Sequence, residues 1–174
     1  MEKFLAAYDK LLKLLAQVTG TIAGLLILAC GFMIVYEVIA RGVFNAPTEW
    51  VMELSTYCVT IAGFLGMAIT YAYRKHIRVD ILMSKLSPKA CCYIEVFTSL
   101  AGVFYTYMFT VEGMNMVLMS YEMEITAPTT LGTPMWIPQL SMPVGMCVLF
   151  LHLVRTFIGD IIKIKNQDFG GEVK

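Results

Sequence analysis

The stretch from Trp50 to Asp80 constrains the fold more than any other part of the sequence. It opens with Trp50 and Glu53, continues as an apolar run over Leu54–Thr70, and ends in the basic segment 74–80. About 20 apolar residues, each rising about 1.5 Å, cross a hydrocarbon core about 30 Å thick. Charged side chains are excluded from that core because an ion at its centre costs several kcal/mol. The stretch therefore predicts a membrane-spanning helix with a basic exit.

The composition agrees with a chain that lies mostly in lipid. Of the 174 residues, 58% are hydrophobic and 15% are charged, and the mean hydropathy is +0.70. Soluble domains carry about 25% charged residues. The formal net charge is zero, so no overall basic field favours nucleic acid as a partner. The five cysteines include no C-x-x-C spacing, which argues against a zinc site or a disulfide framework.

Three further apolar stretches flank this one. We expect membrane spans at about 18–39, 50–73, 90–119 and 138–159, all within a single four-helix transmembrane domain over residues 1–165. Residues 166–174 are expected to form a disordered cytoplasmic tail. The short, turn-rich connection between the first two spans predicts an antiparallel hairpin. Pro143 falls early in the fourth span, where a proline can kink a helix.

The segment before the first span is amphipathic. Its apolar residues recur at steps of three and four, and lysines lie between them: Phe4, Leu5, Tyr8, Leu11, Leu12 and Leu15, with Lys3, Lys10 and Lys13. Two arrangements fit this pattern. The segment lies in the membrane interface with its lysines toward anionic lipid, or it extends the first span as one helix.

The distribution of lysine and arginine predicts the topology. All thirteen cations except Arg41 precede the first span, fall in the loop 74–89, or lie at or beyond the inner end of the fourth span, beginning with Arg155. The positive-inside rule assigns these segments to the cytoplasm. We therefore expect an all-α, multi-pass membrane protein with both termini cytoplasmic.

Charged residues also gather around the connection between the first two spans. Arg41 is the only cation there, against three carboxylates, those of Glu37, Glu49 and Glu53. A carboxylate near the membrane boundary needs a polar partner. We predict that Arg41 pairs with Glu53 or with Glu37.

Neither of the two histidines indicates a cofactor. His76 lies in the basic loop and His152 near the inner end of the fourth span. A bis-histidine haem needs two ligands that face each other across helices, and His76 lies outside any span. His152 is expected to pair with a neighbouring side chain or to lie at the interface.

The carboxylates within the spans do not indicate a solute site. They lie nearer the span ends than the midplane, at Glu37, Glu53, Glu95 and Glu112. Secondary transporters bind their solute near the midplane, often at broken helices in repeated halves. The chain is therefore a better candidate for a transporter subunit than for a complete transporter, and no enzymatic activity is expected. Glu95 and Glu112 could each reach an interface or a partner helix.

A set of motifs follows in order from Gly20 to Ile162. Arg41 closes the first span, Trp50 and Glu53 open the second, Gly63 and Gly66 lie within it, Arg74 and His76-Ile77-Arg78-Val79-Asp80 follow it, and Thr133-Pro134-x-Trp136-Ile137-Pro138 precedes Pro143 and Gly145. With four spans and this length, the chain resembles the small membrane subunit of the tripartite ATP-independent periplasmic (TRAP) transporters, the DctQ-like family.

The resemblance implies a function and a set of partners. Such subunits work with a large transmembrane permease subunit, which carries the substrate and sodium sites, and with a periplasmic substrate-binding protein. An ion gradient, usually of sodium, drives uptake of an organic acid such as a carboxylate or a sialic acid. The small subunit would act as a scaffold in the bacterial inner membrane, in contact with lipid, and no cofactor is expected in it. The alternative is a free-standing four-helix membrane protein, either a small exporter or a redox subunit.

The resemblance also implies roles for residues at the periplasmic side. Arg41, Trp50 and Glu53 would pin the end of the first hairpin, as part of a subunit interface or as an internal clamp. Trp136 and the prolines near it, including Pro143, would shape the periplasmic loop against the binding protein. Anchoring of Trp136 in the membrane interface is the alternative.

On the cytoplasmic side, the implied residues are Arg74, His76, Arg78 and Asp80. They would fix the loop after the second span, with Asp80 capping a short helix that follows. For the cations, the alternative is that they only set the orientation and contact lipid headgroups.

Overall fold

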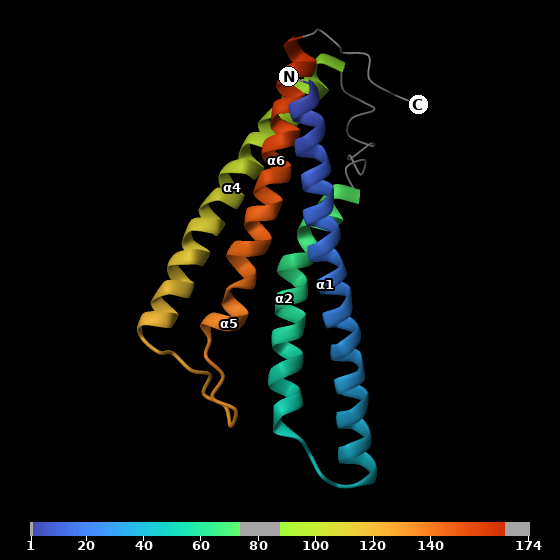
Figure 1. Ribbon diagram of the computed structural model, residues 1–174, viewed down its shortest axis with the longest axis vertical. Coiled ribbons are helices and arrows are strands. Elements are labelled where there is room, and N and C mark those ends of the chain that lie inside the picture. Colours follow the sequence, from blue (N-terminus) through green and yellow to red (C-terminus); the bar gives the residue numbers. More distant parts are fainter. Residues whose placement is uncertain (1, 74–87, 166–174) are drawn as a thin grey trace.

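The computed structural model describes the backbone of residues 2–73 and 88–165, and in these ranges every long element is a helix. The helices are α1 (Glu2–Val43), α2 (Glu49–Tyr73), α4 (Pro88–Glu122), the short α5 (Trp136–Gln139) and α6 (Ser141–Lys165) (Figure 1). Four helical segments are long and apolar enough to cross a membrane: Ala7–Val43, Glu49–Tyr73, Ala90–Glu122 and Trp136–Ile162. The predicted all-α fold with four membrane-spanning helices is confirmed.

The first helix is continuous. α1 runs from Glu2 to Val43 without a break, so no separate interfacial helix precedes the first span. Leu12 and Ala16 are buried, whereas Lys10 and Lys13 are exposed. Of the two arrangements that the sequence allowed, the structure has the extended span, with Leu12 and Ala16 buried in the bundle.

The helices are arranged as two antiparallel pairs. α1 packs along α2 and α4 packs along α6, while contacts between α2 and α6 join the pairs (Figure 1). Small residues allow the close approach of α1 and α2. Ala23 and Ala62 are buried together with Leu65, and a Cβ placed on Gly66 would lie 3.8 Å from that of Ala23. The core of the first pair is therefore a seam of short side chains.

The contact between α2 and α6 depends on a glycine. A Cβ placed on Gly145 would overlap the carbonyl oxygen of Phe64. Phe64 lies in the middle part of α2, so the start of α6 meets α2 well inside that helix. The second pair is thus shifted along the first, and Figure 1 shows α4 and α6 ending short of the α1–α2 connection.

The fourth span is interrupted before Pro143 and not at it. α5 ends at Gln139, α6 begins at Ser141, and the amide of Leu140 between them donates to the carbonyl of Trp136 at 3.0 Å. Pro143 therefore lies in the first turn of α6, where its missing N–H needs no partner. Its side chain is fully buried, and its Cδ would lie 3.3 Å from a Cβ on Gly113 of α4. The break between α5 and α6 lies within the turn before Pro143, where a proline cannot donate a hydrogen bond to the carbonyl four residues earlier, here that of Gln139.

Candidate functional site

The predicted site residues that the structure describes lie toward one end of the bundle. We call it the loop end, because it carries the connections 44–48 and 123–135. Arg41, Trp50 and Glu53 flank the first connection, and Trp136 and Pro143 follow the second. The other predicted residues, Arg74, His76, Arg78 and Asp80, lie outside the described residues.

Glu37 holds the first connection in place. Its carboxylate is buried and accepts hydrogen bonds from the backbone amide of Thr48, at 3.1 Å, and from the Thr48 hydroxyl. Beside it, the rings of Tyr36 and Trp50 lie 5.9 Å apart. Because Thr48 directly precedes α2, these contacts set the point at which the chain re-enters the bundle.

Glu53 links the first helix pair to the second connection. Its carboxylate is buried and accepts a hydrogen bond of 2.7 Å from the Tyr57 hydroxyl. It also lies near the side chains of Thr129 and Thr133. A backbone hydrogen bond of 2.9 Å, from the amide of Ala127 to the carbonyl of Thr133, holds together the connection 123–135. Glu53 thus meets an ordered loop.

The predicted ion pair of Arg41 with Glu37 or Glu53 is wrong. Arg41 is exposed, and among the residues that the structure describes it lies within ion-pair distance of neither carboxylate. The physical reason is that neutral donors already satisfy the two buried carboxylates. Thr48 and Tyr57 do so without bringing a guanidinium group out of water.

These contacts predict opposite outcomes for two substitutions. Thr48→Val keeps the shape of the side chain but removes the hydroxyl that donates to Glu37, so we expect a loss of about 1–2 kcal/mol of stability. Arg41→Ala, at an exposed side chain one turn from Glu37, should change stability by less than about 0.5 kcal/mol. Thermal unfolding of both variants in one detergent measures the difference. A larger loss of stability for Arg41→Ala than for Thr48→Val would contradict this prediction and support an ion pair of Arg41 with a buried carboxylate.

Trp136 packs on the end of α4. Its ring meets that of Tyr121 edge to face, with centroids 5.8 Å apart and an interplanar angle of 85°. The two rings line an open hollow of about 390 Å³ together with Glu122 and Glu124. The structure therefore places this tryptophan in a contact between α4 and α5, at the mouth of an acidic hollow.

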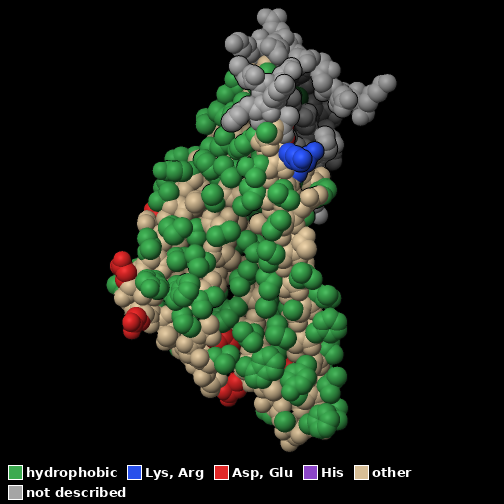
Figure 2. Space-filling model, viewed as in Figure 1, with side chains coloured by type: hydrophobic (Ala, Val, Ile, Leu, Met, Phe, Trp, Pro, Cys, Tyr) green, Lys and Arg blue, Asp and Glu red, His purple; other side chains and the backbone are tan. Residues whose placement is uncertain are grey.

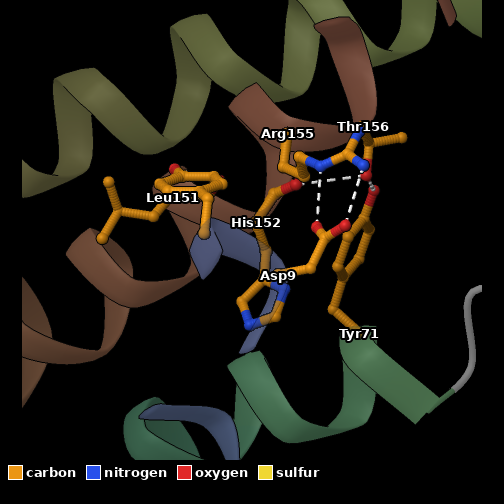
Figure 3. A network of polar contacts seen from close by, with 7 residues as sticks. Asp9, Tyr71, Leu151, His152, Arg155 and Thr156 are labelled. Atoms are coloured by element: carbon orange, nitrogen blue, oxygen red, sulfur yellow. Dashed lines mark hydrogen bonds and ion pairs between the residues drawn. The ribbon is translucent and has the colours of Figure 1, made fainter. Parts of the chain in front are cut away.

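At the opposite end of the bundle, an ion pair joins α1 to α6. The Nε and one terminal nitrogen of Arg155 donate to the two carboxylate oxygens of Asp9, at 2.7 and 2.8 Å (Figure 3). The neighbouring Tyr8 hydroxyl donates to the carbonyl of Leu151 at 3.1 Å. A two-pronged pair of this kind fixes orientation as well as distance, so it sets the rotation of α1 against α6.

A second set of contacts joins α2 to α6 beside this ion pair. The Tyr71 hydroxyl lies 3.1 Å from the Thr156 hydroxyl, and the Tyr71 ring meets the buried His152 ring edge-on with centroids 6.4 Å apart (Figure 3). The expectation that His152 pairs with a neighbouring side chain is confirmed. Farther along α6, Ser99 of α4 donates to buried Asp160 at 2.8 Å.

Sequence reasoning missed this network. Asp9 lies in a lysine-rich segment and Arg155 in an apolar run, 146 positions apart. The one available signal was Arg155 itself, because a cation inside an apolar run needs a partner. The described polar residues thus join helices at both ends of the bundle. In the ranges 2–73 and 88–165, no group of His, Cys, Asp and Glu side chains is placed to hold a metal ion.

Comparison with known proteins identifies similar chains. Residues 30–163 match the family model for the DctQ component of the tripartite ATP-independent periplasmic transporters. A relative from Rhodobacter capsulatus, the C4-dicarboxylate TRAP transporter small permease protein DctQ, is 30% identical over 112 residues. The matched region covers 62% of this chain and 48% of the relative, so the chain matches about half the length of that protein.

Proposed function

From the premise that the chain belongs to the DctQ-component family of the TRAP transporters, a family of small membrane subunits, we propose that it braces a large permease subunit in the bilayer. The observation that carries this proposal is the family match over residues 30–163, which includes the last part of the first membrane-length helix and the whole of the other three. The described polar side chains support it as well, because they join helices to one another.

The transport cycle is proposed on the same basis. An ion gradient, that of sodium, drives uptake of an organic acid that a periplasmic binding protein delivers. The name of the Rhodobacter capsulatus relative refers to C4-dicarboxylates, which supports a carboxylate as the substrate class. We place the substrate and sodium sites in the large subunit.

For the orientation, we propose that the loop end faces the periplasm. Lys10, Lys13 and Arg155 all lie toward the other end of the bundle, and the positive-inside rule assigns that end to the cytoplasm. Both termini would then be cytoplasmic. Labelling of residues 74–89 by a membrane-impermeant reagent in intact cells would contradict this orientation.

The predicted site residues keep structural roles in this proposal. Glu53 clamps the first helix pair to the periplasmic loop, and Trp136 and Pro143 position that loop on α4 and α6. Arg41 and Trp50 lie on the outer rim of the first hairpin, where they face lipid headgroups or the binding protein. For Arg74, His76, Arg78 and Asp80, the proposed role is to fix the cytoplasmic loop.

Co-purification tests the function directly. A tagged copy of the chain, extracted from native membranes in mild detergent, should recover a large permease subunit in stoichiometric amount. Vesicles that contain the chain together with the permease and the binding protein should accumulate a radiolabelled dicarboxylate under a sodium gradient, and vesicles that lack the chain should not. Solute uptake by vesicles that contain this chain alone would overturn the proposal.

A further inference from the structure

An isolated carboxylate lies on the outward face of α4. Glu112 is exposed, and within the described part of the chain no hydrogen bond or ion pair reaches it. Asn115, one turn farther along the helix, is exposed as well. Neither polar side chain is therefore buried against another described helix.

This carboxylate lies at the depth of the bundle interior. The next residue, Gly113, faces Met142 and Pro143 at the start of α6, and Gly145 of the same turn lies against Phe64 in the middle part of α2. Glu112 is therefore level with the interior of a membrane-spanning helix, and the sequence-based expectation that it lies nearer a span end is wrong, because the second helix pair is shifted along the first. Figure 1 agrees, since α4 ends at a level partway along α2 and well short of the α1–α2 connection.

The surface around Glu112 is apolar in both directions along α4. Met108 on one side and Met119 on the other are exposed at 42% and 54%. The next carboxylate, Glu122, is ten residues on, which is about 15 Å along a helix. Figure 2 shows hydrophobic side chains over most of the visible face, with acidic ones toward the loop end and the basic ones toward the other end.

Contact with lipid is energetically unfavourable for this face of α4, because it carries two polar side chains at the depth of the hydrocarbon. A carboxylate exposed to hydrocarbon is costly, so ionisable residues in membrane helices face a protein partner or water. Asn side chains in such helices likewise form hydrogen bonds across helix interfaces. A second copy of this chain offers no matching cation at that depth, since the described Lys and Arg residues lie toward the helix ends.

We infer that the face of α4 formed by Met108, Glu112, Asn115 and Met119 binds the large permease subunit, with Glu112 accepting hydrogen bonds from a cationic side chain of that subunit. This inference rests on the proposed function, which supplies a permanent partner within the membrane. It assigns α4 as the subunit-facing helix of the second pair.

Site-specific photocrosslinking in the assembled transporter tests this face. A benzophenone amino acid in place of Met108 or Asn115 should crosslink to the large permease subunit. The matched control is Met114, which is exposed at 43% at the same depth but lies about 160° around the helix from Glu112. It should crosslink at a much lower yield. Crosslinks from the first two positions to lipid alone or to a second copy of this chain would overturn the inference.

Substitution of the carboxylate provides an independent measurement. Glu112→Leu should weaken recovery of the permease by about tenfold, as expected for the loss of a hydrogen bond to a charged group. Glu112→Gln, which retains an acceptor, should lose less, and Met114→Leu should have no effect. The thermal stability of the isolated chain separates this effect from misfolding, because Glu112 makes no hydrogen bond or ion pair with any residue that the structure describes.

The two proposals fail in different ways. If the unsubstituted chain recovers no permease, the proposed function fails, and this inference fails with it. If the unsubstituted chain recovers the permease while Glu112→Leu recovers equal amounts and Met114 crosslinks as well as Asn115, the inference alone is wrong.

Discussion

Gly145→Val is expected to separate α2 from α6 and to destabilise the bundle strongly. A Cβ at this position would overlap the backbone carbonyl of Phe64. The backbone carbonyl of Phe64 cannot rotate out of the way as a side chain can, so the two helices must move apart. Overpacking of this kind costs about 1–3 kcal/mol, and the two branches of valine place the substitution toward the upper part of that range. Thermal unfolding in detergent measures the loss.

The matched control for this substitution lies on the partner helix. Gly63 directly precedes Phe64, and a Cβ added to it would meet no atom within 4 Å. Gly63→Val should therefore have a much smaller effect than Gly145→Val. Equal losses at the two positions would mean that the valine acts through helix propensity and not through the contact between α2 and α6.

Arg155→Met is expected to loosen α1 from α6. The substitution keeps most of the side-chain length but leaves the Asp9 carboxylate without its two-pronged partner. Removing one member of a buried pair costs about 3–5 kcal/mol. Because the Asp9 side chain is 41% exposed, we expect a smaller loss of about 2 kcal/mol. A lower unfolding temperature in detergent would show it.

Two further variants identify the cause of that loss. In the double variant Asp9→Asn with Arg155→Met, no charge remains to be compensated, so stability should recover in part. Lys10→Met removes an exposed cation next to Asp9 and should have little effect. If the double variant were as unstable as Arg155→Met alone, the ion pair would not be the source of the stability.

The loop end shows where prediction from sequence reached its limit. The residues around the first connection were identified correctly as a place where buried carboxylates need partners, but the partner was wrong. A count of charges at that end favours Arg41, whereas the fold presents the Thr48 amide and hydroxyl to Glu37 at shorter range. A neutral donor on the same connection needs less desolvation than a guanidinium group.

The sequence by itself determined the number of spans and the antiparallel order of the first two helices. Both depend on local features: the length of an apolar run and the residues of a short turn. Only the tertiary structure decided the ion pair of Asp9 with Arg155, the shift of the second helix pair along the first, and the outward position of Glu112. These depend on how far each helix is rotated and displaced against its neighbours. Apolar runs in lipid leave rotation and displacement open, because every face of such a helix is hydrophobic and close packing at a few glycines sets the register.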